Sequence, residues 1–295
     1  MARVAIVGVG AIGGVLAALL DATGRHQITL CTRRPLSQLT VKTPEGVVTV
    51  KAINVTDPTI AEPVDWVLVA TKTYDASAAA AWFPTLCRGN ALAAVVQNGV
   101  EHRERFAPFL SHERILPVII DCPVERQPDG VVRQRRAAQM KVEAGALGRE
   151  FAELFSGSDG QIELTDDFVS AAWRKLCINS VGALSALTSK PAGVLRDEAM
   201  AEIALGIAAE CAAVGRAEGA HLDDSIAQEV VDGYRAQPPD SINSMLADRL
   251  ALRPMEIDAR NGVIVRKGES HRIKTPLNRM AVALLRTLGE TSRSP

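Results

Sequence analysis

A glycine-rich turn near the amino terminus constrains the fold of this chain more than any other feature. Gly8, Gly10 and Gly13 lie in the segment GVGAIGG. This segment directly follows the apolar run Arg3–Val7 and opens a helical pattern over Ala11–Ala22. The first glycine permits a tight turn, the second lets a ligand approach the backbone, and the third lets the helix pack against the strand. The pattern predicts a dinucleotide-binding strand–turn–helix unit.

The amino terminus of the predicted helix adds a second reason to expect a phosphate-containing ligand. Its first N–H groups have no partner within the helix, and its dipole presents a positive end. Both properties favour the pyrophosphate of a dinucleotide. The predicted cofactor-binding residues of this turn are Gly8, Gly10, Ala11, Ile12 and Gly13.

The end of the next predicted strand, Gln27–Cys31, indicates which dinucleotide is bound. An NAD-binding domain usually has Asp or Glu there, which binds the ribose 2′-hydroxyl. This chain instead has Thr32-Arg33-Arg34 after the strand. A guanidinium binds a 2′-phosphate in bidentate fashion and stacks on adenine. We therefore predict NADP(H) as the cofactor and Arg33 as a residue that binds it. The alternative is that both arginines are solvated loop charges.

Strands and helices alternate through the first half of the chain, and the second half is helical. The expected strands after the first two are Val47–Val55, Trp66–Ala70, Ala91–Val96 and Ile115–Ile120, and the expected helices between them are Asp75–Leu86 and Glu101–Leu110. A turn at Pro128-Asp129-Gly130 indicates a hairpin at the sheet edge within 124–144. The later helices are expected over Phe168–Leu187, Glu198–Glu218, Asp224–Tyr234, Glu256–Val265 and Pro276–Leu288.

This order predicts an α/β fold with two domains. Alternation of strands and helices is typical of a doubly wound parallel sheet, so we expect an N-terminal Rossmann-type domain over 1–166. Apolar residues at helical spacing predict a C-terminal all-helical domain over 167–295. The aliphatic helices of this second domain offer a surface for a homodimer.

Composition excludes several classes of partner. The 33 basic and 34 acidic residues give a net charge of -1, and no charged tail accompanies them. We therefore expect no nucleic-acid partner and no membrane partner. The sequence contains no run of about 18 apolar residues, so we expect no membrane span. The five cysteines are scattered without the spacing of metal ligands, which indicates free thiols, no metal site and a cytoplasmic location.

Two predicted strands of the first domain end in polar residues that point to ligand binding. Lys72 follows Trp66–Ala70, and Asn98 follows Ala91–Val96. Loops at the carboxyl ends of parallel strands face the ligand crevice of such sheets. Lys72 can donate to the cofactor ribose or to an anionic substrate, and Asn98 can both donate and accept. A surface lysine and an ordinary Asn-Gly turn are the alternatives.

Polar residues in the second domain suggest the chemistry. Lys175 and Asn179 are four residues apart and therefore lie on one face of a largely apolar helix. Such a lysine can donate a proton to a carbonyl oxygen as a hydride reaches the carbon. Ser244 can donate to a substrate carboxylate, and Glu256 lies at the start of a predicted helix, whose dipole stabilises an anion. A solvated helix face and an ordinary helix-start acid are the alternatives.

Taken together, these segments resemble the ketopantoate reductase family, the 2-dehydropantoate 2-reductases. The resemblance covers essentially the whole chain. It rests on GVGAIGG, the TK at Lys72, the QNG at Asn98, the W-x-K-x-x-x-N of residues 173–179 and the SML-x-D…EID-x-x-NG of residues 244–262. It implies NADPH-dependent reduction of a 2-keto acid to a 2-hydroxy acid in pantothenate biosynthesis.

The resemblance also implies roles for individual residues. Lys175 is the general acid, and Glu256 orients and polarises the reacting group. The substrate-binding residues that it implies are Asn98, Asn179 and Ser244, and the cofactor-binding residues that it implies outside the glycine turn are Arg33, Lys72 and Asn98.

Two departures from the family pattern bear on the substrate. Family members that act on ketopantoate commonly have a second asparagine where this chain has Ala183, and the segment Asp121-Cys122-Pro123 replaces a small glycine- and alanine-containing one. Loss of a polar partner lowers discrimination for a substrate hydroxyl. The alternatives are therefore the same chemistry on another branched or aromatic 2-keto acid, or an NADP-sensing protein without turnover.

Overall fold

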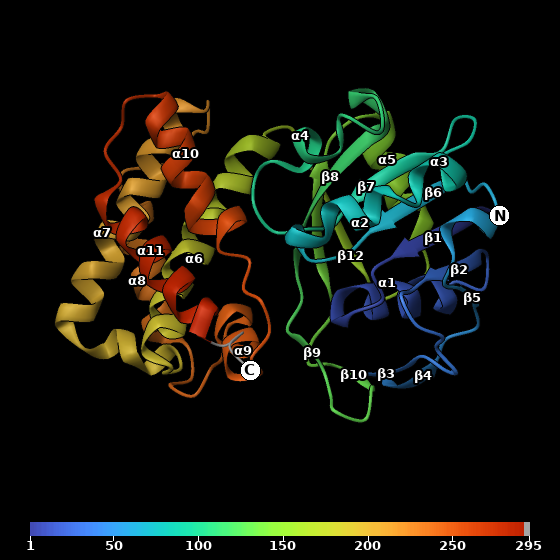
Figure 1. The fold of residues 1–295 in the computed structure, drawn as a ribbon, viewed down its shortest axis with the longest axis horizontal. Helices are drawn as coiled ribbons and strands as arrows, with labels where there is room; N and C mark the ends of the chain where they lie inside the picture. Colours follow the sequence, from blue (N-terminus) through green and yellow to red (C-terminus); the bar gives the residue numbers. More distant parts are fainter. Residues whose placement is uncertain (292–295) are drawn as a thin grey trace. The chain divides into compact units, whose positions relative to one another are not determined.

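The computed structural model describes residues 1–291 and contains two compact units (Figure 1). Unit 1 comprises Met1–Gln97 and Glu101–Phe168. Unit 2 comprises Asn98–Val100 and the chain from Val169 onward. The short segment Asn98–Val100 thus belongs to unit 2, although it lies within the range predicted for the cofactor domain.

Unit 1 is built on an eight-stranded sheet with the strand order β12-β11-β8-β7-β6-β1-β2-β5. The six strands from β8 to β5 in this order are parallel, whereas β11 pairs antiparallel with β8. The strands are β1 (Arg3–Val7), β2 (Gln27–Cys31), β5 (Ile53–Val55), β6 (Trp66–Val69), β7 (Leu92–Val95), β8 (Ile115–Asp121), β11 (Gln139–Glu143) and β12 (Gln161–Thr165). The predicted parallel sheet is confirmed. Strand β11 lies within the stretch 124–144 that was predicted to extend the sheet edge and adds there antiparallel to β8, whereas β12 was not predicted.

Strand β1 lies in the middle of this sheet because both of its faces are apolar. Val4 and Ile6 pack in a core cluster with helix α1 (Ala11–Ala22) and with Phe151 of helix α5 (Ala146–Leu154). Ala5 and Val7 point to the opposite face and pack in a second cluster on the side of α2–α4. Continuous apolar strands covered on both faces are typical of parallel sheets.

The helices that cover the second face are shorter than predicted. The helix expected over 75–86 is divided into α2 (Ala76–Ala80) and α3 (Phe83–Leu86). Pro84 lies in the first turn of α3, where its missing N–H group has no helical partner to lose. In a continuous helix over 75–86 the same residue would remove a backbone hydrogen bond, which explains the division. The helix expected over 101–110 is limited to α4 (His102–Phe106).

A second, four-stranded sheet has the order β4-β3-β10-β9. The predicted turn at Pro128-Asp129-Gly130 does join an antiparallel pair, β9 (Val124–Arg126) and β10 (Val132–Gln134). The prediction that this hairpin extends the main sheet is wrong, because β10 pairs with β3 (Thr40–Thr43) instead. The strand expected over 47–55 is also divided, into β4 (Gly46–Thr49) of this sheet and β5 of the main one.

Unit 2 is helical, as predicted. Its helices are α6 (Phe168–Thr188), α7 (Glu198–Ala217), α8 (Ile226–Ala236), α9 (Ser244–Leu250), α10 (Val263–Ser270) and α11 (Pro276–Thr291). A core cluster joins buried residues of α6, α7, α8 and α10, including Trp173, Ile207, Val230 and Ile264. The predicted α/β fold with a helical C-terminal region is confirmed.

Two local features of unit 2 were not predicted. Helix α9 is absent from the prediction because it is short and polar residues interrupt its pattern. The expected helix over 256–265 begins later, with a π-helical turn at Asp258–Gly262 that continues into α10. Such turns are rare and occur frequently at functional sites.

Candidate functional site

The glycine turn of unit 1 has the geometry that close backbone approach requires. Gly8 has a φ of 96°, and a Cβ there would lie 2.6 Å from the backbone nitrogen of Thr71. A Cβ at Gly13 would collide with the carbonyl oxygen of Gly8. By contrast, nothing lies within 4 Å of the Cβ position of Gly10. The turn is therefore tightly packed against the sheet below and open above Gly10.

The amino terminus of α1 is free to receive an anion. Gly10 is its N-cap and offers no side-chain hydrogen bond, and no acidic residue lies in the first turn. The predicted residues Ala11 and Ile12 begin this 12-residue helix. Exposed N–H groups and the positive end of the helix dipole point into the open space above the turn. These residues fit the pyrophosphate of a dinucleotide.

Arg33 is well exposed beyond β2, with 85% of its side chain accessible. Its Nη2 atom lies 3.7 Å from Oδ2 of Asp75, which ends the 3-10 turn Thr73–Asp75. An exposed ion pair at this distance contributes about 0–1 kcal/mol to stability. A phosphate dianion can therefore replace Asp75 as the partner of Arg33. Sequence reasoning missed Asp75, which reaches Arg33 from a different strand end.

A buried glutamine fixes the two strand-end loops that precede Lys72 and Asn98. Gln97 donates through Nε2 to the carbonyl oxygen of Thr71 at 3.0 Å and to its Oγ1 at 2.9 Å. Its Oε1 accepts from Nη1 of Arg105 at 2.9 Å. The half-buried Lys72 follows Thr71 directly, so its backbone is held by this hydrogen-bond network.

Buried His102 supports the same glutamine. Its Nε2 lies 2.8 Å from the carbonyl oxygen of Gln97, and its ring meets Phe168 edge-on. Burial lowers the pKa of His102 to about 4, with smaller contributions from nearby arginines. The imidazole is therefore neutral near pH 7, and Nε2 must carry the hydrogen because a carbonyl oxygen can only accept.

In unit 2, helix α6 carries Lys175 and Asn179 on one half-buried face. The opposite face is apolar and includes the buried Trp173, Leu176 and Cys177. Burial of that face fixes the rotation of the helix about its axis. The two polar side chains are thus held about 6 Å apart along the helix, at 1.5 Å per residue.

Asn98 links α6 to Glu256. Asn179 Nδ2 donates to Asn98 Oδ1 at 3.4 Å, and Asn98 Nδ2 donates to Glu256 Oε2 at 2.8 Å. Glu256 is only 5% exposed. Close packing holds this arrangement, since a Cβ at Gly99 (φ 97°) would lie 2.7 Å from the carbonyl oxygen of Ala259. Three of the predicted site residues are therefore joined by hydrogen bonds in unit 2.

Ser244 begins α9, which Asn243 caps by accepting hydrogen bonds from Met245 and Leu246. Ser244 is exposed, and its Oγ accepts a 2.6 Å hydrogen bond from Nη2 of Arg260. Arg260 is 3% exposed and lies in the π-helical turn. Sequence reasoning missed this arginine, which occupies a variable position of the EID-x-x-NG pattern.

Ala183, where the family pattern has an asparagine, is fully buried on α6. It packs in a small apolar cluster with Ala186, Met245, Ala281 and Leu285. An alanine fits these neighbours, and the position supplies no polar group.

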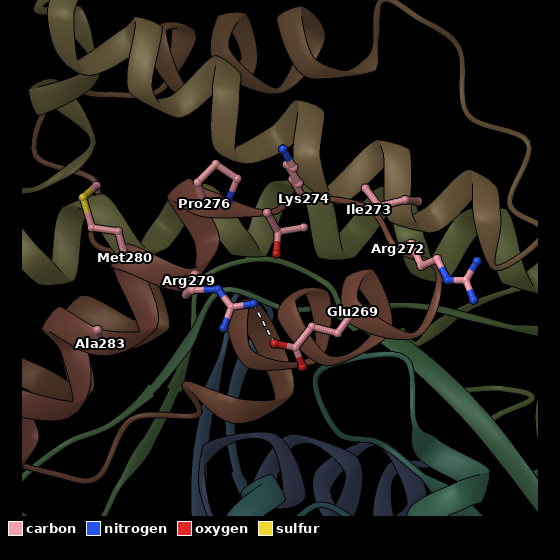
Figure 2. A pocket seen from close by; sticks show the side chains of 9 residues that line it. Glu269, Arg272, Ile273, Lys274, Pro276, Arg279, Met280 and Ala283 are labelled. Atoms are coloured by element: carbon pink, nitrogen blue, oxygen red, sulfur yellow. Dashed lines mark hydrogen bonds and ion pairs between the residues drawn. The ribbon is translucent and has the colours of Figure 1, made fainter.

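An open pocket of about 610 Å³ lies beside the connection between α10 and α11 (Figure 2). Figure 2 shows Arg279 and Glu269 paired across it, with 2.6 Å between nitrogen and oxygen. None of the predicted site residues lines this pocket. The pocket is therefore not part of the predicted site.

A membrane-spanning helix and a metal-binding cluster are both absent from residues 1–291, the described part of the chain. No helix there is long and apolar enough to cross a membrane. No group of three or more His, Cys, Asp or Glu side chains there is arranged to hold a metal ion.

Comparisons with known proteins agree over the whole chain. Residues 4–147 match the family model "Ketopantoate reductase PanE/ApbA", and residues 167–289 match its C-terminal counterpart. A 2-dehydropantoate 2-reductase of Caulobacter vibrioides is 46% identical over 97% of this chain and 98% of its own length. One from Mycobacterium tuberculosis is 38% identical, with 96% of each chain covered. A crystal structure of a PanE/ApbA family ketopantoate reductase from Ralstonia eutropha has a TM-score of 0.90 at 31% identity, covering 99% of this chain and all of that one.

Proposed function

The chain belongs to the ketopantoate reductase family of oxidoreductases, and we propose that it reduces 2-dehydropantoate to pantoate with NADPH. The hydrogen-bond chain Asn179–Asn98–Glu256 carries this proposal. Two amides and a carboxylate are joined there, and Lys175 is one helical turn before Asn179 on α6; this set of groups supports a carbonyl reduction.

Unit 1 is the proposed cofactor-binding part of the chain. The open α1 amino terminus supports binding of the pyrophosphate by the turn from Gly8 to Gly13. The exposed guanidinium of Arg33 supports NADPH over NADH, since its interaction with Asp75 is weak. We assign Lys72 and Asn98 to the ribose and nicotinamide side of the cofactor. A bound NADPH supplies the hydride that the keto carbon accepts.

Lys175 is the proposed general acid. As the keto carbon is reduced, the carbonyl oxygen gains negative charge and takes a proton from the Lys175 ammonium group. The reaction then balances, since the carbon gains a hydride and the oxygen gains a proton. A positioned acid of this kind contributes about 10²–10⁴-fold in rate.

The neighbouring polar groups orient the substrate. Asn98 and Asn179 each offer a donor and an acceptor to its oxygens, and Ser244 donates to its carboxylate. The buried Glu256 fixes the orientation of the Asn98 amide. A carboxylate can only accept hydrogen bonds, so the NH₂ group of Asn98, and not its carbonyl oxygen, faces Glu256. Through this contact Glu256 helps to polarise the reacting carbonyl.

Replacement of Lys175 tests the proposal. We expect Lys175→Met to lower kcat on 2-dehydropantoate by about 10²–10⁴-fold while the Kd for NADPH stays within about twofold. The matched control is Lys190→Met, at an exposed lysine beyond the end of α6, which should leave both unchanged. Unchanged turnover in Lys175→Met would overturn the role of this lysine.

A substrate panel tests the proposed substrate. Because Ala183 supplies no polar group, the panel compares 2-dehydropantoate with a branched and an aromatic 2-keto acid, each followed by NADPH absorbance. A higher kcat/KM on another member would replace the proposed substrate and keep the chemistry. The predicted homodimer is tested by light scattering, and the predicted cytoplasmic location by fractionation.

A further inference from the structure

We propose that Arg260 binds the carboxylate of the 2-keto acid substrate, together with Ser244. The inference rests on the proposed function and names a residue that the predicted site does not include. It starts from a buried positive charge that lacks a negative partner.

Arg260 is 3% exposed. The ion pairs observed among residues 1–291 include none between Arg260 and a carboxylate, and its Nη2 donates a hydrogen bond to Ser244 Oγ at 2.6 Å. Its Nε atom is buried and has no hydrogen-bond partner in the described chain. A guanidinium cannot lose its charge near pH 7, so burial without an anion costs several kcal/mol. Such an arrangement is expected where an anionic ligand completes the site.

The phenol of Tyr234 lies near Arg260 and adds no negative charge to it. The phenol of Tyr234 is buried and donates to the carbonyl oxygen of Ile178 at 3.0 Å. Burial raises the pKa of Tyr234 to about 12, and the charge of Arg260 opposes that rise. The phenol is therefore neutral near pH 7 and does not compensate the guanidinium.

The position of Arg260 agrees with a substrate role. Its partner Ser244 is exposed and begins α9, and the neighbouring Asn243 donates to the carbonyl oxygen of Gly182 at 3.3 Å. Gly182 is three residues beyond Asn179 on α6, about 4.5 Å along the helix. On the other side, Arg260 is one helical turn beyond Glu256 in sequence. A ligand between these residues reaches Arg260 and Ser244 with one end and Asn179 and Glu256 with the other.

A 2-keto acid has the matching chemistry. Its carboxylate is adjacent to the carbonyl carbon, so a guanidinium that binds the carboxylate also fixes the carbonyl for reduction. The planar guanidinium can present two N–H donors to two oxygens, which no lysine can do.

The test replaces Arg260 with methionine, which is similar in length and uncharged. For the full-length protein saturated with NADPH, we expect Arg260→Met to raise the KM for 2-dehydropantoate by about 10- to 100-fold, as for lost charged hydrogen bonds. The Kd for pantoate, measured by calorimetry, should rise similarly. Arg260→Lys should restore only part of the affinity. Arg272→Met, at an exposed arginine of the same unit, is the control.

Stability separates this role from a structural one. Because the buried charge lacks a partner, Arg260→Met should leave the Tm of the ligand-free protein unchanged or raise it. A lower Tm with an unchanged Kd for pantoate would assign Arg260 to the fold and overturn the inference. If the unsubstituted protein neither reduces 2-dehydropantoate nor binds pantoate, the proposed function itself fails. If the unsubstituted protein does both and Arg260→Met binds pantoate equally well, only the inference on Arg260 fails.

Discussion

Replacing Asn98 with aspartate would exchange an amide donor for a second carboxylate beside Glu256. In the protein, Asn98 Nδ2 lies 2.8 Å from Glu256 Oε2. The substitution changes almost no volume, so its effect comes from charge. Two carboxylates at this separation cannot both remain ionised at low cost.

The magnitude follows from the distance and the burial. At an effective dielectric constant of about 20, two unit charges 2.8 Å apart repel by about 6 kcal/mol. Taking up a proton instead costs about 4 kcal/mol at pH 7.5, for a carboxyl of ordinary pKa near 4.3 at 1.36 kcal/mol per pH unit. Proton uptake is the cheaper response. We therefore expect Asn98→Asp to lose about 4 kcal/mol of stability at pH 7.5 and about 2 kcal/mol at pH 5.5.

The sign follows from proton binding. Between these pH values the folded variant holds a proton that its unfolded state releases, so its stability falls as pH rises relative to the unsubstituted protein. Urea unfolding followed by circular dichroism at several pH values measures this difference. The control Asn98→Leu removes the hydrogen bond without adding charge and should cost about 1–3 kcal/mol at every pH. A pH-independent loss in Asn98→Asp, equal to that of Asn98→Leu, would refute the reasoning.

Three further predictions concern unit 1. Arg33→Ala should raise the KM for NADPH by about 10- to 100-fold and leave that for NADH within about twofold, because only NADPH has a 2′-phosphate; equal effects on both cofactors in steady-state assays would contradict this role. Gly13→Ala should cost about 1–3 kcal/mol, measured as a lower Tm, because its Cβ collides with the Gly8 carbonyl oxygen; an unchanged Tm would show that the turn can relax. Burial lowers the pKa of His102 to about 4, so the folded protein keeps this histidine neutral while the unfolded chain protonates it below about pH 6.5. The free energy of unfolding is therefore unaffected above pH 6.5 and falls by about 3 kcal/mol as the pH is lowered to 4. Urea unfolding should show this loss in the unsubstituted protein relative to His102→Gln, and parallel pH curves for the two would rule it out.

Elements with strong local signals were predicted residue by residue. Strand β1, helix α1 and strand β2 have the bounds that the sequence predicts. Here a buried apolar run ends at Gly8, and the helix begins directly after Gly10, so the local sequence determines both ends. Helix α6 was also predicted closely because its apolar face repeats over many turns.

Elements that depend on distant partners were predicted poorly. The run 47–55 is rich in β-branched residues, and nothing local indicates that its first part pairs with β3 and its last part with β2. The hairpin at β9 and β10 was recognised from its turn, but its pairing with β3 depends on residues about 90 positions away. Strand propensity predicts that a segment is extended and says little about its neighbours.

The candidate site divides in the same way. The pairing of Lys175 with Asn179 on α6 follows from helical periodicity alone. The contact between Asn98 and Glu256 joins residues 158 positions apart, so only the resemblance to a family suggested that both belong to one site. Asp75 was missed because it reaches Arg33 from a different strand end.

Arg260 was missed for a different reason, which bears on how buried charges are interpreted. Glu256 and Arg260 are one helical turn apart and almost equally buried, and Arg260 retains a buried Nε without a hydrogen-bond partner in the described chain. The EID-x-x-NG pattern leaves position 260 unspecified. What distinguishes Arg260 is the energetic cost of burying its guanidinium, and this cost cannot be recognised from the spacing of the pattern. An arginine there lowers stability unless a ligand supplies the missing anion. The ligand-free protein is then expected to keep or gain stability when that arginine is removed, whereas removal of an arginine on which the fold depends lowers stability.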